Sequence, residues 1–237
     1  MERVSVIQTR QQEENLAAQA KIHLSREVVS TEITREPSLW YHATKRFLDF
    51  TLSVVGIVVL LPVFLAIALA IKLDDGGEAL HFREIIGKDG RRFFALKFRT
   101  MIPRADEFLA KNPDLMKKFL QNMKLERDPR ITRVGRFLRK TSLDELPQLF
   151  NVLIGQMSLV GPRMIHPSEL PRYGEWARKR LSVQPGITGL WQISGRQHIS
   201  YTERVRLDMH YIDNRSLFLD LAILVKTFKV FIIHTGA

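Results

Sequence analysis

Two adjacent carboxylates stand in the stretch TSLDELPQLFNVL, residues 141–153, directly after a strongly basic run. On an expected helix the side chains of Asp144 and Glu145 point about 100° apart and therefore suit different tasks. We expect a carboxylate among many cations to keep a low pKa and stay ionised. One carboxylate could then attack a phosphorus atom while the other binds Mg²⁺ or orients a second substrate. Arginine, lysine or metal would have to offset the like-charge repulsion of that attack.

The arginines upstream could supply this compensation. Arg130, Arg133, Arg136 and Arg139 recur at every third position. We expect Arg133 and Arg136 to contact substrate phosphate, although the same spacing also suits a solvated face or lipid headgroups. The carboxylates have a structural alternative as well, because residues 142–145 fit the S-x-x-E capping box of a helix start.

An uncharged run of 22 residues, Phe50 to Ile71, predicts a membrane helix. As one helix it would extend about 33 Å, close to the thickness of the hydrocarbon core of a bilayer. Pro62 should break it into two half-helices, so it could dip into the membrane and return to the same side. Basic residues flank both ends, whereas a spanning helix usually has them on one side. These flanks point toward a re-entrant helix, but composition alone leaves a kinked spanning helix equally open.

The rest of the chain predicts a mainly helical, membrane-associated fold with one small β-hairpin. The hairpin covers residues 78–101, turning at Gly87-Lys88-Asp89-Gly90. The last apolar segment carries three charges, so it fits a core helix or one lying in the membrane interface. Expected segments are a disordered polar arm (1–40), a membrane helix (44–73), helices at 104–124 with a break near Pro113, a loop-like stretch (155–196), and helices at 201–212 and 217–233.

Composition narrows the classes of function. The net charge of +11 indicates an anionic partner, and residues 91–140 hold fifteen Lys/Arg against five Asp/Glu. With no cysteine there is no disulfide, thiolate metal site or cysteine nucleophile. The histidines show no metal-binding spacing. A non-catalytic anchor that binds nucleic acid or acidic lipid is a second hypothesis, but it has no need for the carboxylate pair; we expect no nucleic acid partner.

Three separated blocks carry a resemblance to a known family. They are KFRTM (97–101), RITRVGRFLRKTSLDELPQLFNVLIGQMSLVGPR (130–163) and PGITGLWQISGR (185–196). In this order they resemble the bacterial sugar transferase family, the monotopic polyprenyl-phosphate phosphoglycosyl transferases that start exopolysaccharide, capsule and O-antigen synthesis. The resemblance runs from about Thr44 to the C-terminus and favours the re-entrant form of the helix around Pro62.

The resemblance implies an activity and its partners. Such an enzyme moves sugar 1-phosphate from a UDP-sugar to undecaprenyl phosphate and releases UMP. Membrane lipids and downstream glycosyltransferases are further expected partners. The catalytic domain, residues 74–237, would lie on the cytoplasmic face of the bacterial inner membrane. No motif identifies the sugar, so galactose, glucose and N-acetylated sugars all stay open.

The resemblance also implies roles for single residues. Asp144 would be the nucleophile that forms a covalent phosphosugar intermediate, and Glu145 its partner, associated with Mg²⁺. Further expected substrate contacts are Lys97 and Arg99 of KFRTM, Pro162 and Arg163 of a nucleotide loop, and Arg196 of a phosphate-binding loop.

Some positions depart from the family pattern or have no assigned role. The family usually reads GDMSLVGPRP, whereas this chain has Gln156 and Met164, which could loosen a contact behind the site and the nucleotide loop. Trp191 fits a packed core position better than stacking on uracil. Asp208 and Tyr211 match family positions without a role that the sequence explains.

Overall fold

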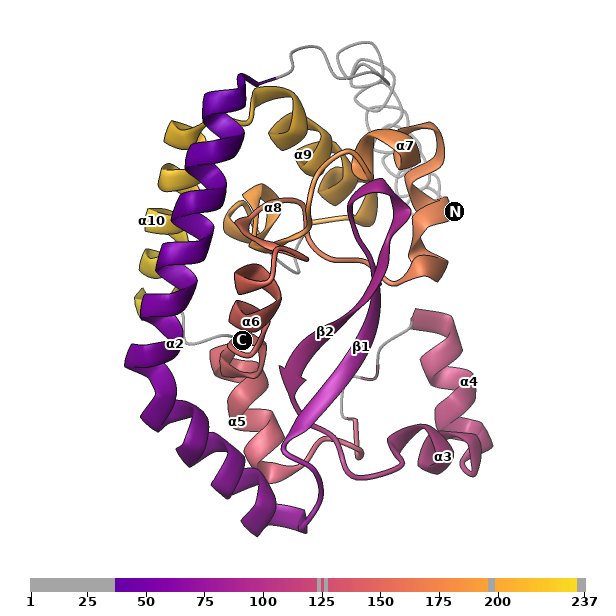
Figure 1. Ribbon diagram of the computed structural model, residues 1–237. Coiled ribbons are helices and arrows are strands. Elements are labelled where there is room, and N and C mark those ends of the chain that lie inside the picture. The colour runs from indigo at the N-terminus through magenta and orange to yellow at the C-terminus, as the bar shows by residue number, and fades with distance from the viewer. Residues whose placement is uncertain (1–36, 123–124, 126–127, 196–198, 234–237) are drawn as a thin grey trace, which may run out of the picture.

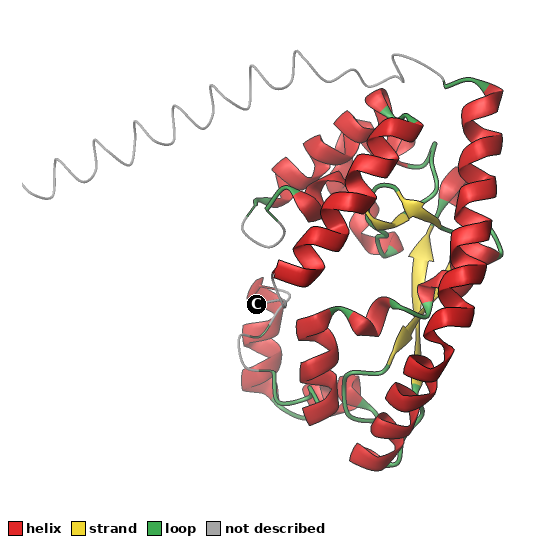
Figure 2. Cartoon of the chain, turned by 90° about the vertical axis from the view of Figure 1, so that its left-hand side faces the viewer, coloured by secondary structure: helices red, strands yellow, loops and turns green. Residues whose placement is uncertain are grey.

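The computed structural model describes residues 37–122, 125, 128–195 and 199–233 of the 237-residue chain. The expected polar arm lies almost entirely outside these ranges. Helices predominate over a few strands (Figure 2), which confirms the mainly helical fold class.

The most prominent element is α2 (Leu39–Asp75), which is long and apolar enough to cross a membrane. Ser38 caps its start by accepting a hydrogen bond from the Tyr41 backbone N–H, and Gly76 ends it in a left-handed conformation with φ 71°. Pro62 lies inside the helix, and α2 bends part-way along (Figure 1). A bend is expected because proline removes a hydrogen bond and crowds the preceding turn. The chain stays helical across Pro62, however, so α2 is one bent helix and not two separate half-helices.

The first part of α2 is fastened to the rest of the molecule by charged side chains. Lys45 Nζ lies 2.9 Å from Asp220 Oδ2 in α10 (Leu217–Ile233). Arg46 donates hydrogen bonds of 2.7 Å to the carbonyls of Val152 and Leu153. Because these partners lie more than a hundred residues away, the contacts fix the helix on the folded body rather than on a local turn.

The last part of α2 is fastened to the same body. Ile67 and Ile71 are buried against Phe98 and Leu138. At the helix end, Asp74 accepts a hydrogen bond of 3.1 Å from the Val134 backbone N–H. Both ends of α2 therefore contact one folded unit, while apolar side chains of the intervening helix remain exposed, among them Val58, Val59, Leu65 and Leu69.

The expected hairpin is confirmed. Strands β1 (Leu80–Ile86) and β2 (Arg92–Phe98) pair antiparallel, and the turn η1 (Lys88–Gly90) connects them. Asp89 and Gly90 both have positive φ, 57° and 75°, which suits these turn residues. The hairpin is long and twisted (Figure 1), and its second strand carries Lys97.

The helices on either side of the carboxylates also follow the sequence. Elements α3 (Ala105–Ala110) and α4 (Pro113–Asn122) show the expected break at Pro113. Next come α5 (Arg133–Thr141), the short turn η2 (Leu143–Glu145) and α6 (Gln148–Leu153). Helix α9 (Tyr201–Asn214) and α10 complete the described chain, close to the expected bounds.

The stretch expected to be loop-like contains more structure than predicted. It holds strands β3 (Ser158–Val160) and β4 (Gly186–Thr188), which pair in parallel, and the helical segments η3 (Pro167–Trp176), α7 (Ala177–Arg180) and α8 (Leu190–Ile193). Each strand has three residues, too few for an alternating pattern to be visible in a sequence rich in Gly and Pro.

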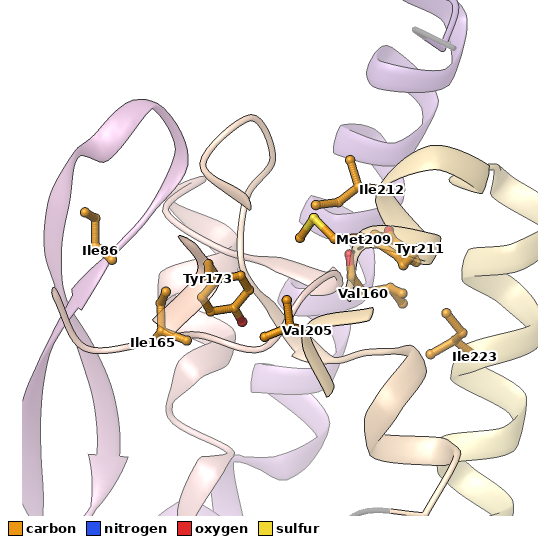
Figure 3. Packing of buried hydrophobic residues seen from close by; sticks show 9 residues of the cluster. All are labelled: Ile86, Val160, Ile165, Tyr173, Val205, Met209, Tyr211, Ile212 and Ile223. Carbon is orange, nitrogen blue, oxygen red and sulfur yellow. Dashed lines mark hydrogen bonds between the residues drawn. The ribbon is translucent and has the colours of Figure 1, made fainter. Parts of the chain in front are cut away.

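The largest buried apolar cluster lies where this stretch meets α9 and α10. It joins residues from β1, β3, η3, α9 and α10 (Figure 3), so it fixes the hairpin and the last two helices around the parallel strand pair; its members are Ile86, Val160, Ile165, Tyr173, Val205, Met209, Tyr211, Ile212 and Ile223.

Candidate active site

The carboxylate pair occupies a single 3-10 turn between two helices. Thr132 caps the start of helix α5, since its hydroxyl accepts a hydrogen bond of 2.9 Å from the Gly135 backbone N–H. Gly135 is required because a Cβ there would lie 2.1 Å from the Thr100 carbonyl oxygen. Ser142 ends α5 with φ 55°, and Asp144 and Glu145 follow in η2.

The capping-box alternative is wrong. Ser142 makes no capping hydrogen bond with its side chain, and its left-handed backbone differs from the extended conformation of an N-cap. The Glu145 carboxylate bonds instead to two cations from other elements. The pair therefore faces a charged site rather than serving the helix start.

Lys97 of β2 is central to this site. Its Nζ lies 2.7 Å from Glu145 Oε1 and 3.9 Å from Asp144 Oδ2. Arg163 approaches Glu145 from another direction, with Nη2 3.0 Å from the same Oε1. Glu145 is thus held by two cations. In the part of the chain that the structure describes, Asp144 accepts no hydrogen bond and has only the longer contact with Lys97.

The two carboxylates consequently have opposite pKa shifts. Burial raises the pKa of Asp144 and the charge of Glu145 adds to this, while Lys97 and Arg139 only partly offset it. Burial would also raise the pKa of Glu145, but Arg163 and Lys97 outweigh it and lower that pKa to about 2. The expected low pKa is therefore found for Glu145. For Asp144 the prediction is wrong, because desolvation exceeds the attraction of its cations.

Arg163 is held by an aromatic ring as well as by Glu145. Its guanidinium carbon lies 5.7 Å from the ring centre of Trp191, and that of Arg204 lies 4.8 Å from the same ring. Trp191 is buried, with 8% of its surface exposed. It therefore packs as the sequence favoured, and its ring supports the Arg163 guanidinium that places positive charge beside Glu145.

The loop that carries Arg163 is positioned by close backbone contacts. After β3, Gly161 donates to the Thr188 carbonyl and Gly186 donates to the Pro162 carbonyl, both at 2.9 Å. A Cβ on Gly186 would lie 2.1 Å from the Gly161 nitrogen. The glycines of SLVGPR and PGITG thus permit two segments to cross at van der Waals distance and present Arg163 to the dyad. Pro162 itself is buried beneath this crossing.

The other expected substrate residues that the structure describes do not bond to this cluster. Arg99 pairs with Asp75 at the end of α2 and donates to the Met101 carbonyl at 2.9 Å. Arg133 and Arg136 are exposed on α5 and, among the described residues, have no hydrogen bond or ion pair. Arg196 lies outside the described residues. Substrate contacts of these four arginines stay predictions.

The remaining arginines of the ladder behave differently. Arg130 is buried and pairs with Asp128 at 2.7 Å. Arg139 donates from Nε to the Thr100 hydroxyl at 2.8 Å, and its charge lowers the pKa of Asp144. Arg139, which the sequence ranked below Arg133 and Arg136, is thus the ladder member whose charge acts on the dyad.

Comparison with known proteins gives the site its context. A family model described as bacterial sugar transferase matches residues 40–234. The chain belongs to the bacterial sugar transferase family. The expected resemblance is confirmed over nearly the whole described chain.

Individual relatives support the same assignment. The exopolysaccharide production protein ExoY of Rhizobium meliloti is 44% identical over 197 residues, 81% of this chain and 87% of that protein. The undecaprenyl-phosphate galactose phosphotransferase of Salmonella typhimurium is 46% identical over 81% of this chain, but only 41% of that protein is covered. The undecaprenyl-phosphate glucose phosphotransferase of Komagataeibacter xylinus is 39% identical over 84% of this chain and 38% of that protein.

The two departures from the family pattern can now be placed. Gln156 Oε1 accepts a hydrogen bond of 2.7 Å from Asn151 Nδ2, so a neutral amide oxygen stands where the family has a carboxylate. Whether this exchange loosens the contact behind the site stays a prediction. Met164 is buried against the inner face of the hairpin, with Ile85 and Phe93 in the same cluster. It fills core space beside the Arg163 loop.

Asn151 is a functional candidate that sequence reasoning missed. Its side chain accepts from the Leu96 backbone N–H at 2.9 Å and donates to the Phe94 carbonyl at 2.8 Å. It thereby joins α6, which follows the dyad, to β2 next to Lys97. The only available signal was that Asn151, like Gln148, is a polar residue in the apolar stretch LPQLFNVLIG.

The site has a limited capacity for a metal ion. In the described ranges no cluster of three or more His, Cys, Asp or Glu side chains could hold one. Mg²⁺ is commonly bound by one or two carboxylates together with substrate phosphates and water. Glu145, with Asp144 beside it, fits that smaller donor set.

Proposed function

We propose that this sugar transferase moves a sugar 1-phosphate from a UDP-sugar to undecaprenyl phosphate, with UMP as the other product. The relatives named as undecaprenyl-phosphate galactose and glucose phosphotransferases support this reaction. The relative named as the exopolysaccharide production protein ExoY supports a role in exopolysaccharide synthesis. UDP-galactose and UDP-glucose are accordingly the first donors to test.

We propose a double displacement in which Asp144 is the nucleophile. A carboxylate oxygen of Asp144 bonds to the sugar-bearing phosphorus, the bond from that phosphorus to the bridging oxygen breaks, and UMP leaves with the electron pair. A phosphate oxygen of undecaprenyl phosphate then attacks the aspartyl phosphosugar. The Asp144 carboxylate is regenerated and undecaprenyl diphosphate sugar is released.

One observation carries this assignment of roles: the unequal environment of the two carboxylates. Glu145 is engaged by Lys97 and Arg163 at 2.7 and 3.0 Å, so its position is fixed and it is a poor nucleophile. Asp144 has no such short contact, and its raised pKa indicates a more basic and more nucleophilic carboxylate. Lys97, Arg139 and Arg163 supply positive charge for the incoming phosphate groups.

Mg²⁺ would complement these cations, held by Glu145 together with phosphate oxygens of the donor. When bound, it would neutralise charge on the diphosphate and so favour departure of UMP. Removal of Mg²⁺ with EDTA should abolish UMP release and added Mg²⁺ should restore it. Full activity in EDTA would remove the metal from the proposal.

The arrangement of α2 supports a re-entrant membrane helix. Its two ends contact the same folded body, through Lys45 and Asp74, while its middle exposes apolar side chains. A spanning helix would place these ends on opposite sides of the bilayer. We propose that the body lies on the cytoplasmic face of the inner membrane, with the exposed apolar side of α10 in the interface.

The assignment of Asp144 can be tested with one matched pair of variants. Asp144→Asn removes the nucleophile and should reduce UMP release from UDP-sugar and undecaprenyl phosphate by roughly a thousandfold or more. Asp89→Asn makes the same exchange in the exposed hairpin turn, where asparagine tolerates positive φ, and should leave the rate unchanged. UMP release by Asp144→Asn at the wild-type rate would refute the assignment.

A further inference from the structure

A buried polar network lies directly behind the loop that presents Arg163. Arg180, the last residue of α7, is completely buried. Its Nη2 donates to the Arg163 carbonyl at 2.7 Å and to the Pro162 carbonyl at 3.5 Å. The main chain of the loop is therefore held on its inner side by a side chain that does not itself reach the dyad.

Two further side chains complete this network. Asp208 of α9 is 1% exposed, and the positive charge of Arg180 attracts its carboxylate and lowers its pKa against the effect of burial. The Tyr173 hydroxyl donates to Asp208 Oδ2 at 2.9 Å. The network thus runs from η3 through α9 and α7 to the loop. Arg180, Asp208 and Tyr173 are called the brace below.

Several buried polar atoms of the brace lack a hydrogen-bond partner in the described part of the chain, which is unfavourable for stability. Among the described residues, Arg180 Nε and Nη1 and Asp208 Oδ1 are buried without a hydrogen-bond partner. Burial raises the pKa of Asp208 to about 7 in spite of the opposing charge of Arg180. Burying such charges costs several kcal/mol, and apolar residues would often serve stability as well or better. This cost points to a function in geometry rather than in stability.

We propose that the brace positions Arg163 for its contact with Glu145, so that these three buried residues act on the reaction through Arg163 alone. Arg180 fixes the carbonyl orientation of Pro162 and Arg163. The charge of Asp208 attracts the Arg180 guanidinium, and Tyr173 holds the Asp208 carboxylate through its hydrogen bond. With its backbone held, the Arg163 guanidinium lies both 3.0 Å from Glu145 and over Trp191. The catalytic consequence rests on the function proposed above, whereas the positioning itself does not.

A double-mutant cycle distinguishes positioning from a general loss of structure. Arg180→Met should lower kcat/KM for UMP release by about tenfold to a hundredfold, the range expected for small misplacement of a site group. In an Arg163→Gln background the same change should have no further effect, because the residue through which it acts is already lost. Equal effects of Arg180→Met in both backgrounds would overturn the proposal.

The chain offers a matched control for this cycle. Asp213 pairs with buried Lys179 at 2.7 Å, so this ion pair joins the same two helices, α7 and α9. Asp213→Asn should leave kcat/KM close to the wild-type value. Any small loss should be the same in the wild-type and in the Arg163→Gln background. The proposal would be refuted if Asp213→Asn lowered kcat/KM as much as Arg180→Met does and if this loss also disappeared in the Arg163→Gln background. Any disturbance between α7 and α9 would then have the same effect as losing the brace.

A second readout needs no catalysis. The chain has three tryptophans, so Trp40→Phe and Trp176→Phe leave Trp191 as the single indole. In that protein, Arg163→Gln removes the guanidinium group from the Trp191 ring and should shift the fluorescence emission of Trp191. Asp208→Asn and Tyr173→Phe should cause the same shift, because they let the Arg163 guanidinium move off the ring. Asp213→Asn should leave the emission unchanged. Unchanged emission would overturn the proposal. A shift in a protein that never releases UMP would support the brace and refute only the proposed reaction.

Discussion

Asp144 and Glu145 are neighbours in the chain, yet they occupy different electrostatic environments. Glu145 forms short ion pairs with both Lys97 and Arg163. Among the residues that the structure describes, Asp144 has only a longer contact, 3.9 Å from Lys97 Nζ. The sequence predicts the residue types and the surplus of cations, because both are visible as a motif. It cannot predict which carboxylate is paired, because Lys97 and Arg163 come from segments 48 and 18 residues away from Glu145.

Lys97 provides a test at the level of one residue. Asp144 must be ionised to attack, so activity falls as the pH drops through its pKa. Lys97 lowers that pKa against the effect of burial. Lys97→Met should therefore raise it, shift the acid limb of the kcat/KM profile to higher pH, and reduce the plateau by about a hundredfold.

The profile of UMP release against pH checks this result. Lys88→Met removes the same charge from the exposed hairpin turn and should leave both the limb and the plateau in place. An acid limb at the wild-type pH in Lys97→Met would contradict the electrostatic role given to Lys97.

At the scale of elements, the sequence predicts those with a strong local signal. The turn GKDG between apolar runs predicts the β1–β2 hairpin, and Pro113 predicts the break between α3 and α4. The parallel pairing of β3 and β4 was missed. It depends on Gly161 and Gly186 approaching each other from segments 25 residues apart, and no local pattern records such a crossing.

Asn151 provides a test at the level of elements because it joins α6 to β2. Asn151→Ala leaves the Phe94 carbonyl, the Leu96 N–H and the Gln156 amide without this partner. The free energy of unfolding should fall by about 3 kcal/mol. The rate of UMP release should also fall, since Lys97 follows Leu96 directly.

Urea unfolding in detergent together with UMP release measures both effects. Asn112→Ala is the control, because Asn112 bonds within its own turn, to the Phe108 carbonyl at 2.6 Å. Equal losses of stability in the two variants would show that Asn151 has no special part in holding β2.

At the level of the whole molecule, α2 and α10 both have apolar side chains that the folded body leaves exposed. On α10 the exposed side chains include Phe218, Leu221, Val225 and Phe228. Composition alone predicts a membrane helix but not whether it spans. That choice depends on contacts of both helix ends with one body, which only tertiary structure reveals.

Introduced cysteines provide a test at this scale, since the chain has none of its own. Ser38→Cys and Glu78→Cys lie at exposed positions beyond the two ends of α2. A re-entrant helix predicts that a membrane-impermeant maleimide labels neither in intact spheroplasts and both in inverted vesicles. Lys88→Cys on the hairpin marks the side of the folded body. Labelling of either end from outside would establish a spanning helix.

The covalent role of Asp144 is tested most simply by the mass of the enzyme after incubation with donor alone. With UDP-galactose or UDP-glucose and no undecaprenyl phosphate, we expect a hexose phosphate on Asp144 and released UMP. Adding undecaprenyl phosphate should then remove the adduct. Asp144→Asn should carry no adduct. An adduct at another residue, or UMP that forms only when donor and lipid are both present, would contradict the account.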